Sequence, residues 1–560
     1  MDSLEIVKRF DALDAQRKPL ESTLEIIERF VIPLRSGFFQ DLGSEGEVDW
    51  RLREIYDGTA IEANETLAAS LQGSLTPITT RWFHMQYRQD ALNKDRDAMM
   101  WLEQASDIAY QALLDSNFNL EVSEFYLELT SYGSSILFEE WMDDPYDQGL
   151  DFKAMPTRDS YFEVDHRQNC LRFYRRYRWT PLQIIDKFGV EKVPSTIVEA
   201  SKNPSQNDVR EDVIFCVYLR PDKKDKLYSI KPLAPEERPV GWKYVLKKDG
   251  TTFDGGSYYE MPAFVARWRK VAGSQFGYSP AFVCLSDILT LNELKQEILE
   301  ALGKVVDPAT LVTERNLLSD VDLGRGGMTV VRDLNGIGAY ESKARFDVSE
   351  LKVQQLQQAI NRAFRVDQLQ LKESPAMTAT EVQVRYELMQ RLMGPTLGRL
   401  QHDFLDPMLK RTFAILMRNG QIPMPPPVVQ EAGAELDIQY TGPLPRAQRQ
   451  DTLMAVNSWV AMMAQLMQVY PELRDIPDID RIGRGTAELA GIPADMLRSD
   501  KEVRQIREAR QKMEAMMAQI QAAQAEGEAM KAQGEGRQAM AETEANNPEI
   551  DNYGPQAAEA

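Results

Sequence analysis

The residues of this chain that could do chemistry are spread along it without the spacing that chemistry needs. Gly303-Lys304 is followed by valine, so the phosphate-binding pattern G-x-x-x-x-G-K-[ST] is missing. The glycine-rich stretches at 324–327 and 336–338 lack the strand–glycine–helix setting of a dinucleotide site, and we interpret both as turns. The sequence therefore predicts neither an ATPase site nor a bound nucleotide cofactor.

Metal-binding patterns are also incomplete. The spacing Asp115-x-Asn117-x-Asn119 resembles the start of a calcium loop, but Leu120 stands where that loop needs glycine and Tyr126 where it needs the closing glutamate. The histidines and cysteines show no paired ligand or disulfide spacing. They are His84, His166, His402, Cys170, Cys216 and Cys284. We expect no metal, no cofactor and no catalytic residue, and hence a protein that is not an enzyme.

The composition is that of a large acidic chain. Its 560 residues exceed what one core usually holds, so several modules are expected. A formal net charge of −21 argues against tight general binding to nucleic acid, but it suits an acidic wall past which DNA slides, and it serves solubility equally well. The cysteine usage indicates reduced thiols and synthesis in a cytosol. The sequence predicts neither a signal peptide nor a membrane span.

Two helices joined by a compact insertion are expected in the middle of the chain. The first begins at Ser279, whose hydroxyl can cap it, with Pro280 at its first position, and it stops near residue 306 before a proline. The second begins at Asp347, which has the capping-box spacing with Glu350, and continues to about residue 367. Such a pair would stand as two neighbouring rods.

A third and longer helix should follow. It begins at Thr378, whose capping box is completed by Glu381, and ends at Asn419-Gly420. Roughly 42 residues at 1.5 Å each would span about 60 Å. Gly394-Pro395 lies in its middle and should kink it.

The first 275 residues indicate helices followed by a mixed region. Residues 1–32 predict two helices broken at Lys18-Pro19, residues 57–75 a closely packed helix of small side chains, and residues 99–140 two more helices. From about 150 to 275, β-rich runs predict an α+β region with a helix at 181–188. Within it, Asp249-Gly250 and Gly255-Gly256 are expected to form turns.

The C-terminal part predicts a strand and two further helices. The strand covers 436–440, and a methionine-rich helix covers 446–469, with methionines expected to fill the core. A capping box at Ser499–Glu502 opens a helix with a heptad-like seam, which needs a partner such as the same helix of another subunit. Past Arg537 we expect a mobile acidic tail. The seam residues are Val503, Ile506, Ala509, Met513, Met516, Ile520 and Ala523.

Four groups of segments combine these caps, kinks and prolines in one order. They are Asp57–Ala60 with Leu67–Leu71, Leu75–Pro77 and Arg81–Phe83; Gly277–Pro280 with Asp287, Leu291, Asn292 and Val306–Pro308; Ala363-Phe364 with Asp367–Leu369; and Met377–Val382 with Arg385, Gly394-Pro395, Gly398–Leu400 and Phe404–Pro407. In these segments the chain resembles the head-to-tail connector (portal protein) family of short-tailed bacteriophages. The likeness covers roughly residues 1–450.

The resemblance implies a mainly α, portal-type ring subunit with an α+β wing region. Residues 1–278 would form the wing, helical over 1–149 and α+β over 150–278. The other parts would be stem helix 1 (279–306), the clip (307–346), stem helix 2 (347–368), a tunnel loop (369–377), a kinked wing helix with the following strand and helix (378–480), crown or barrel helices (481–540) and a disordered acidic tail (541–560).

The resemblance also implies a structural role. Portal proteins form closed, usually dodecameric rings at one capsid vertex, through which double-stranded DNA is packaged and ejected without sequence specificity. The expected protein partners are the packaging terminase, a tail adaptor, and the major capsid and scaffolding proteins, with no membrane. The expected location is the virion, after synthesis in the host cytoplasm.

Three lysines are candidate contacts to DNA in the channel. They are Lys372 in the tunnel loop and Lys352 and Lys304 on the stem, although solvated surface lysines would give the same pattern. Two other classes of protein stay open from the sequence. One is a tail adaptor or scaffolding protein, which suits the acidity and the heptad-like end. The other is a catalytic DNA-packaging enzyme, against which the missing phosphate loop argues.

Overall fold

The computed structural model divides the chain into two compact units, Met1–Ser458 and Trp459–Ala560. The structure describes residues 1–33, 54–89, 92–144, 147–166, 168–203, 209–229, 231–271, 274–306, 310–312, 337–339, 346–369, 393–432, 436–440, 443–470, 472, 476–490, 496, 498 and 500–545. Helices predominate, together with small antiparallel sheets, so the expected mainly α chain with an α+β region is confirmed at that level.

The first helix, α1 (Ser3–Val31), runs without a break through Pro19, so the predicted break at Lys18-Pro19 is wrong. A proline inside a helix costs about 3 kcal/mol. Burial on both sides of the proline offsets this cost, because Phe10 packs on the larger sheet and Leu24 packs in the helical core.

Arg17 on α1 anchors this helix to the sheet region. The guanidinium is fully buried and donates to the carbonyl oxygens of Thr157 and Ser160 at 3.0 and 3.1 Å. It also lies over the ring of Tyr161, 3.8 Å from the centroid. A buried cation needs such partners, so these contacts fix the position of α1 relative to the larger sheet.

Among the described residues, two of the antiparallel sheets have more than two strands. The larger has the order β4-β5-β6-β7-β8 and the smaller β3-β2-β9. Their strands are β2 (Ser134–Asp144), β3 (Asp147–Met155), β4 (Ser160–Val164), β5 (Cys170–Trp179), β6 (Glu211–Leu219), β7 (Val240–Leu246), β8 (Thr252–Tyr258) and β9 (Ala263–Arg267). The strands begin at Ser134, so residues 134–140, which we expected to be helical, are part of β2.

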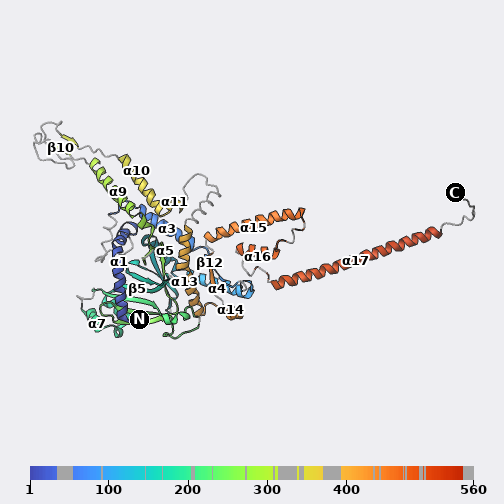
Figure 1. The fold of residues 1–560 in the computed structure, drawn as a ribbon, viewed down its shortest axis with the longest axis horizontal. Helices are drawn as coiled ribbons and strands as arrows, with labels where there is room; N and C mark the ends of the chain where they lie inside the picture. Colours follow the sequence, from blue (N-terminus) through green and yellow to red (C-terminus); the bar gives the residue numbers. More distant parts are fainter. Residues whose placement is uncertain are drawn as a thin grey trace, which may run out of the picture. The chain divides into compact units, whose positions relative to one another are not determined.

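Alternating side chains give the larger sheet two apolar faces. Tyr174 and Cys216 face α1, while Phe173 and Phe215 pack against Phe138 of the smaller sheet. This alternation follows the two-residue period of a strand. The larger sheet therefore lies between α1 and the smaller sheet (Figure 1).

The two predicted glycine turns have different outcomes. Gly250 has φ +75° between β7 and β8, which confirms the turn at Asp249-Gly250. Gly255-Gly256 lies inside β8, so that prediction is wrong. A Cβ at Gly256 would come within 2.7 Å of the ring of Trp242, with which it pairs across the strands. Glycine is needed there to accommodate an indole ring.

The helical core lies in the first unit beside the sheets. It contains α3 (Thr59–Leu75), α4 (Arg96–Asp115) and α5 (Phe118–Tyr132), so the predicted helix at 57–75 and the two helices within 99–140 are confirmed. The predicted strand β12 (Leu436–Tyr440) pairs with β1 (Phe83–Tyr87). Short elements complete the unit: η1 (Leu92–Lys94), η2 (Thr157–Asp159), α6 (Pro181–Phe188, as predicted), η3 (Val190–Lys192), α7 (Ser195–Lys202), η4 (Pro221–Lys226) and α14 (Pro427–Ala432).

The two predicted rods are present as a helical hairpin. Its elements are α8 (Pro280–Val283), α9 (Leu285–Val306), β10 (Thr310–Val312), β11 (Ile337–Ala339), α10 (Phe346–Ala363) and α11 (Val366–Leu369). The second rod ends at Ala363, earlier than residue 367. Arg365 adopts φ +61°, a left-handed conformation that separates α10 from α11.

The long third helix is described only from Met393 onward. It passes through a π-helical turn, η7 (Gln401–Leu405), into α13 (Asp406–Arg418), and Gly420 with φ +71° confirms the predicted stop. Pro407 lacks an amide hydrogen and crowds the carbonyl of Asp403, which accounts for the wide turn. Because residues 370–392 lie outside the described residues, the kink at Gly394-Pro395 stays a prediction.

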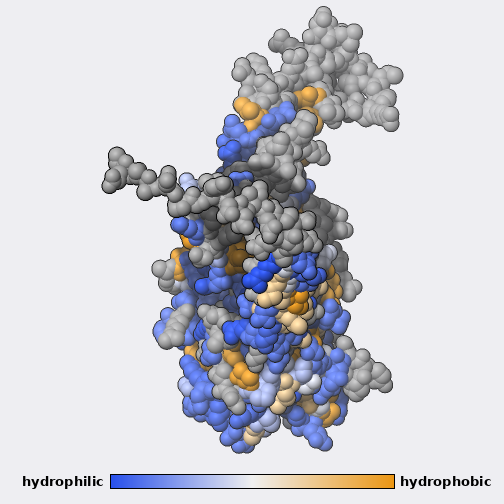
Figure 2. All heavy atoms as spheres, turned by 90° about the vertical axis from the view of Figure 1, so that its right-hand side faces the viewer, coloured by the Kyte–Doolittle hydropathy of each residue, from blue (hydrophilic) through white to orange (hydrophobic). Residues whose placement is uncertain are grey.

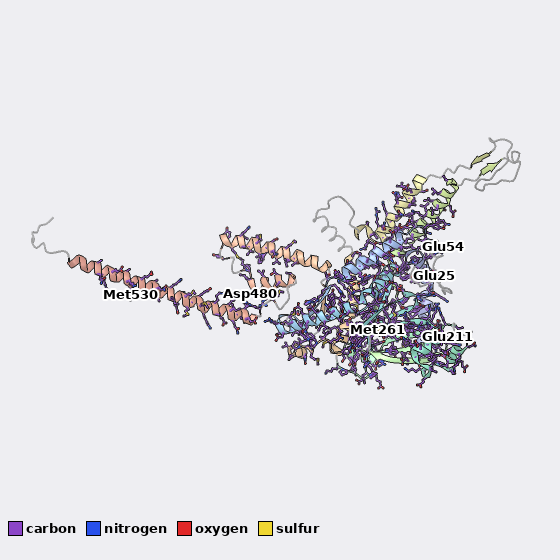
Figure 3. The ribbon with its side chains drawn as sticks, turned by 180° about the vertical axis from the view of Figure 1, so that it is seen from behind. Glu25, Glu54, Glu211, Met261, Asp480 and Met530 are labelled. Carbon is purple, nitrogen blue, oxygen red and sulfur yellow. The ribbon has the colours of Figure 1, made fainter. Side chains whose placement is uncertain are left out.

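The described residues after β12 include the helices α15 (Pro443–Val469), α16 (Ile479–Ala490) and α17 (Asp500–Ala545). The methionine-rich helix is confirmed, but Met454 and Met462 are more than half exposed, and Met463 is the buried one of the three. In the second unit, Arg507 of α17 pairs with Asp480 of α16, at 2.6 Å for one of the two contacts. Asp480 is labelled in Figure 3.

The last helix is longer than the sequence suggested. α17 extends to Ala545, so residues 538–545, expected to belong to a mobile tail, are helical. The helix carries the heptad-like seam, whose residues Ile506, Met513 and Met516 are exposed. Its pairing with another helix stays a prediction.

Candidate functional site

The helices α9 and α10 form an antiparallel pair that shares one apolar seam. Ile288 and Leu291 of α9 and Val353, Leu356 and Ile360 of α10 are all buried in the core cluster that continues into α3 and α5. The three- and four-residue spacing gives each helix one apolar stripe. The hairpin is thus continuous with the main core at its base (Figure 1).

Two glycines allow the chain to enter the hairpin. Gly133, at φ +80° after α5, and Gly277, before α8, touch backbone to backbone. A Cβ on Gly277 would lie 2.1 Å from the carbonyl oxygen of Gly133. The amide of Gly277 also donates to Ser134 Oγ at 2.7 Å. Only glycine allows two backbones to approach so closely.

Ser279 lies at the N-cap position of α8, but its hydroxyl does not cap the helix. It donates to the carbonyl oxygen of Ser131 in α5 at 2.6 Å. The predicted capping role is therefore wrong, and the residue instead ties the start of the hairpin to α5. Pro280 occupies the first helical turn as predicted, and it is buried.

The base of the hairpin is also fixed by Asn292 and Asp57. Asn292 Oδ1 accepts from the amide of Tyr56 at 2.8 Å, and its Nδ2 donates to the carbonyl of Glu54 at 3.1 Å. Asp57 Oδ2 accepts from Gln357 Nε2 at 2.9 Å and pairs with Lys295 at 3.8 Å. Residues preceding α3 therefore contact both helices of the hairpin, near the labelled Glu54 (Figure 3).

A buried charge network attaches α13 to the smaller sheet. Arg411 lies 3.1 Å from Glu260 Oε2 and 3.5 Å from Glu139 Oε2, and Arg418 holds Glu260 with two contacts of 2.6 and 2.8 Å. Thr412 Oγ1 donates to Glu139 Oε1 at 2.7 Å. Glu139, Glu260 and Arg411 are almost completely buried. Removing one member would leave a buried charge unpaired.

The two carboxylates of this network differ in their surroundings. Glu260 accepts a bidentate pair from Arg418, whereas Glu139 Oε2 has no hydrogen bond. Burial raises the pKa of Glu139 to about 7, although Arg411 and Thr412 oppose the shift. Desolvation exceeds the attraction here because the ion pair with Arg411 is long.

The predicted DNA contacts have different outcomes. Lys352 is exposed on α10. Lys304 lies in α9, but its side chain falls outside the described ones, and Lys372 lies outside the described residues. Because only Lys352 has a described side chain, whether the three lie together is not tested, and their role stays a prediction.

The remaining predicted caps and the kink have partial outcomes. α10 begins at Phe346, so Asp347 lies inside the helix and is not its N-cap. Thr378 and Glu381 lie outside the described residues. Gly394 and Pro395 are exposed at the start of the described part of their helix.

Sequence reasoning missed the contacts that hold the hairpin and α13. One signal was available: Arg411 and Arg418 are seven residues apart, so both lie on one side of a helix in which most residues from Met408 to Met417 are apolar, and arginines on such a side need acidic partners. The pairing of Gly133 with Gly277 had no comparable signal, because the two are distant in sequence.

Within the described residues, no group of three or more His, Cys, Asp or Glu side chains could hold a metal ion. The described helices include none that is both long and apolar enough to cross a membrane. The face of the molecule in Figure 2 is largely hydrophilic, with hydrophobic residues in small separate groups.

Comparison with known proteins places this architecture in a family. The family described as bacteriophage head to tail connecting protein matches residues 4–497. The chain belongs to this family. The match includes the hairpin, its anchors around Asp57 and Asn292, and the Arg411 network; α17 follows it.

The names of two curated relatives agree with the membership of this chain in the head-to-tail connecting protein family. One, from Bordetella phage BPP-1, is called a probable portal protein and is 24% identical over 531 residues, covering 92% of each chain. The other, from Salmonella phage epsilon15, is called a portal protein and is 23% identical over 533 residues, again covering 92% of each chain.

Proposed function

We propose that this chain is the portal protein of a bacteriophage: a structural ring subunit at one capsid vertex through which double-stranded DNA enters and leaves the head. The observation that carries the proposal is the family match over residues 4–497, supported by two relatives of nearly equal length that are named portal proteins. The anchored hairpin of α9 and α10 fits the role, because a channel wall must resist force without bending at its base.

The parts of the subunit follow from this proposal. The α9–α10 hairpin is the stem, residues 307–345 between its helices form the clip, and residues from 370 to 377 form the tunnel loop. The sheets and the helical core, with α13, form the wing. α16 and α17 form the crown or barrel. The clip binds the packaging terminase and later a tail adaptor, and the wing faces the capsid and scaffolding proteins.

The chain acts on DNA by shape and charge, without catalysis. Contacts to the DNA backbone come from Lys372, Lys352 and Lys304, and they carry no base readout. The excess of acidic residues keeps these contacts weak, so that DNA can move. The number of subunits in the ring is twelve under this proposal.

The proposal is tested in the virus that encodes the chain. Without the chain, heads should form but contain no DNA, and supplying the intact chain from a plasmid should restore DNA-filled heads and infectivity. DNA-filled heads formed in its absence would contradict the proposal.

A further inference from the structure

The two helices of the hairpin have unlike outward faces. On α9, the outward side carries three exposed carboxylates, Glu293, Glu297 and Glu300, at spacings of four and three residues. That spacing places them on one side of the helix. Lys295 is partly covered and pairs with Asp57, so it does not neutralise this face.

The outward face of α10 has a different chemistry. Leu351 is 58% exposed there, on the side of the helix opposite the buried Leu356 and Ile360. Among the side chains of α10 that the structure describes, from residue 349 on, the exposed charged ones are Lys352, Arg362 and one carboxylate, Glu350. Three exposed glutamines lie between the two cations. They are Gln354, Gln355 and Gln358.

The two faces are complementary. Carboxylates attract Lys and Arg, and they accept hydrogen bonds from glutamine amides. Within one hairpin the faces point outward from their shared seam, so a single chain cannot bring them together. A second copy can, because head-to-tail contact between unlike faces is the kind of interface that closes a ring.

We infer that the acidic face of α9 in one copy packs against the Lys352–Arg362 face of α10 in the next copy. The inference rests on the proposed ring and deepens it by naming its interface. It assigns Lys352 to the contact between subunits in place of the DNA contact proposed above. A chain of net charge −21 repels its own copies, so a local match of opposite charges is needed to select and orient the neighbour. Leu351 would be buried at the same contact.

Two charge-reversal variants of the full-length chain test the pairing. Lys352→Glu/Arg362→Glu makes both faces acidic, and Glu293→Lys/Glu297→Lys makes both faces basic. Each variant should lose ring assembly by about tenfold or more, measured as the fraction of subunits in ring-sized particles by sedimentation velocity and negative-stain imaging. An equimolar mixture should recover rings, because every contact between unlike variants again joins opposite charges.

The controls separate charge from folding. Lys202→Glu/Lys224→Glu lowers the net charge by the same amount as Lys352→Glu/Arg362→Glu, at exposed sites in α7 and η4, and it should assemble like the natural chain. Circular dichroism and the melting temperature should show that all variants fold.

The outcomes distinguish this inference from the proposed function. Rings formed by either reversal variant alone, or no recovery in the mixture, would overturn the inference while leaving the ring proposal intact. If the natural chain forms no rings, the proposed function itself fails.

Discussion

The side chain of Asn292 in α9 makes two hydrogen bonds to the backbone of a segment more than 230 residues away in sequence. Its Oδ1 accepts from the amide of Tyr56 at 2.8 Å, and its Nδ2 donates to the carbonyl of Glu54 at 3.1 Å. This amide side chain is 9% exposed. It makes the base of the hairpin part of the main core, and neither helix of the hairpin could stand in a fixed direction without such contacts.

Replacing Asn292 with alanine should destabilise the chain by about 1–3 kcal/mol, because it removes two partly buried hydrogen bonds, to the amide of Tyr56 and the carbonyl of Glu54. Urea denaturation followed by circular dichroism measures the change. Gln296→Ala on the exposed side of the same helix is the matched control and should change stability by less than about 0.5 kcal/mol. Equal effects of the two substitutions would contradict the role of Asn292.

Gly277→Ala should destabilise the chain by about 1–3 kcal/mol, since the new methyl group would collide with the carbonyl of Gly133. Gly303→Ala in α9 is the control, because a Cβ there meets no atom within 4 Å. That change should be neutral or stabilise by about 0.5–1 kcal/mol through helix propensity. The melting temperature should therefore fall for Gly277→Ala and stay the same or rise for Gly303→Ala. Matching melts would count against the close approach of the two glycines.

Arg411→Ala should cost about 3–5 kcal/mol, because Glu139 and Glu260 would remain buried with one fewer cation. Lys410→Ala, at the exposed neighbouring position, should be nearly neutral. Chemical denaturation of both variants measures the difference. A small effect of Arg411→Ala would mean that water or a rearrangement replaces the guanidinium.

Glu139 should make stability depend on pH. Its folded pKa of about 7 lies above the ordinary value, so the folded state holds a proton that the unfolded state releases. The contribution of Glu139 to the free energy of unfolding is therefore fully present below the ordinary pKa of glutamate. It falls as the pH rises toward 7, because the unfolded state then loses its proton more readily than the folded state. Glu139→Gln should remove this slope, measured as melting temperature against pH from 4.5 to 8. An unchanged slope in the variant would show that other groups cause it.

Local signals allowed part of the fold to be predicted from the sequence. The predicted helix at 181–188 and the predicted glycine stop at Gly420 are both present in the structure. The start of the first rod at Pro280 was equally clear. These features depend on hydrogen bonds and backbone angles that neighbouring residues set.

The features that could not be predicted depend on tertiary contacts. Pro19 would break an isolated helix, but burial of both halves of α1 outweighs its cost. Gly255-Gly256 is a residue pair typical of turns, yet Gly256 lies in a strand because its missing side chain leaves room for the indole of Trp242. Ser279 has the position of a cap, but the carbonyl of Ser131 is a better partner in three dimensions. Each case was decided by a residue distant in sequence.

The most direct test of the account is electron microscopy of the purified full-length chain across several ionic strengths. We expect closed rings of uniform size with a central hole wide enough for double-stranded DNA, built from copies whose hairpins stand side by side around it. Monomers, or filaments without a central hole, under every condition tried would contradict the portal assignment.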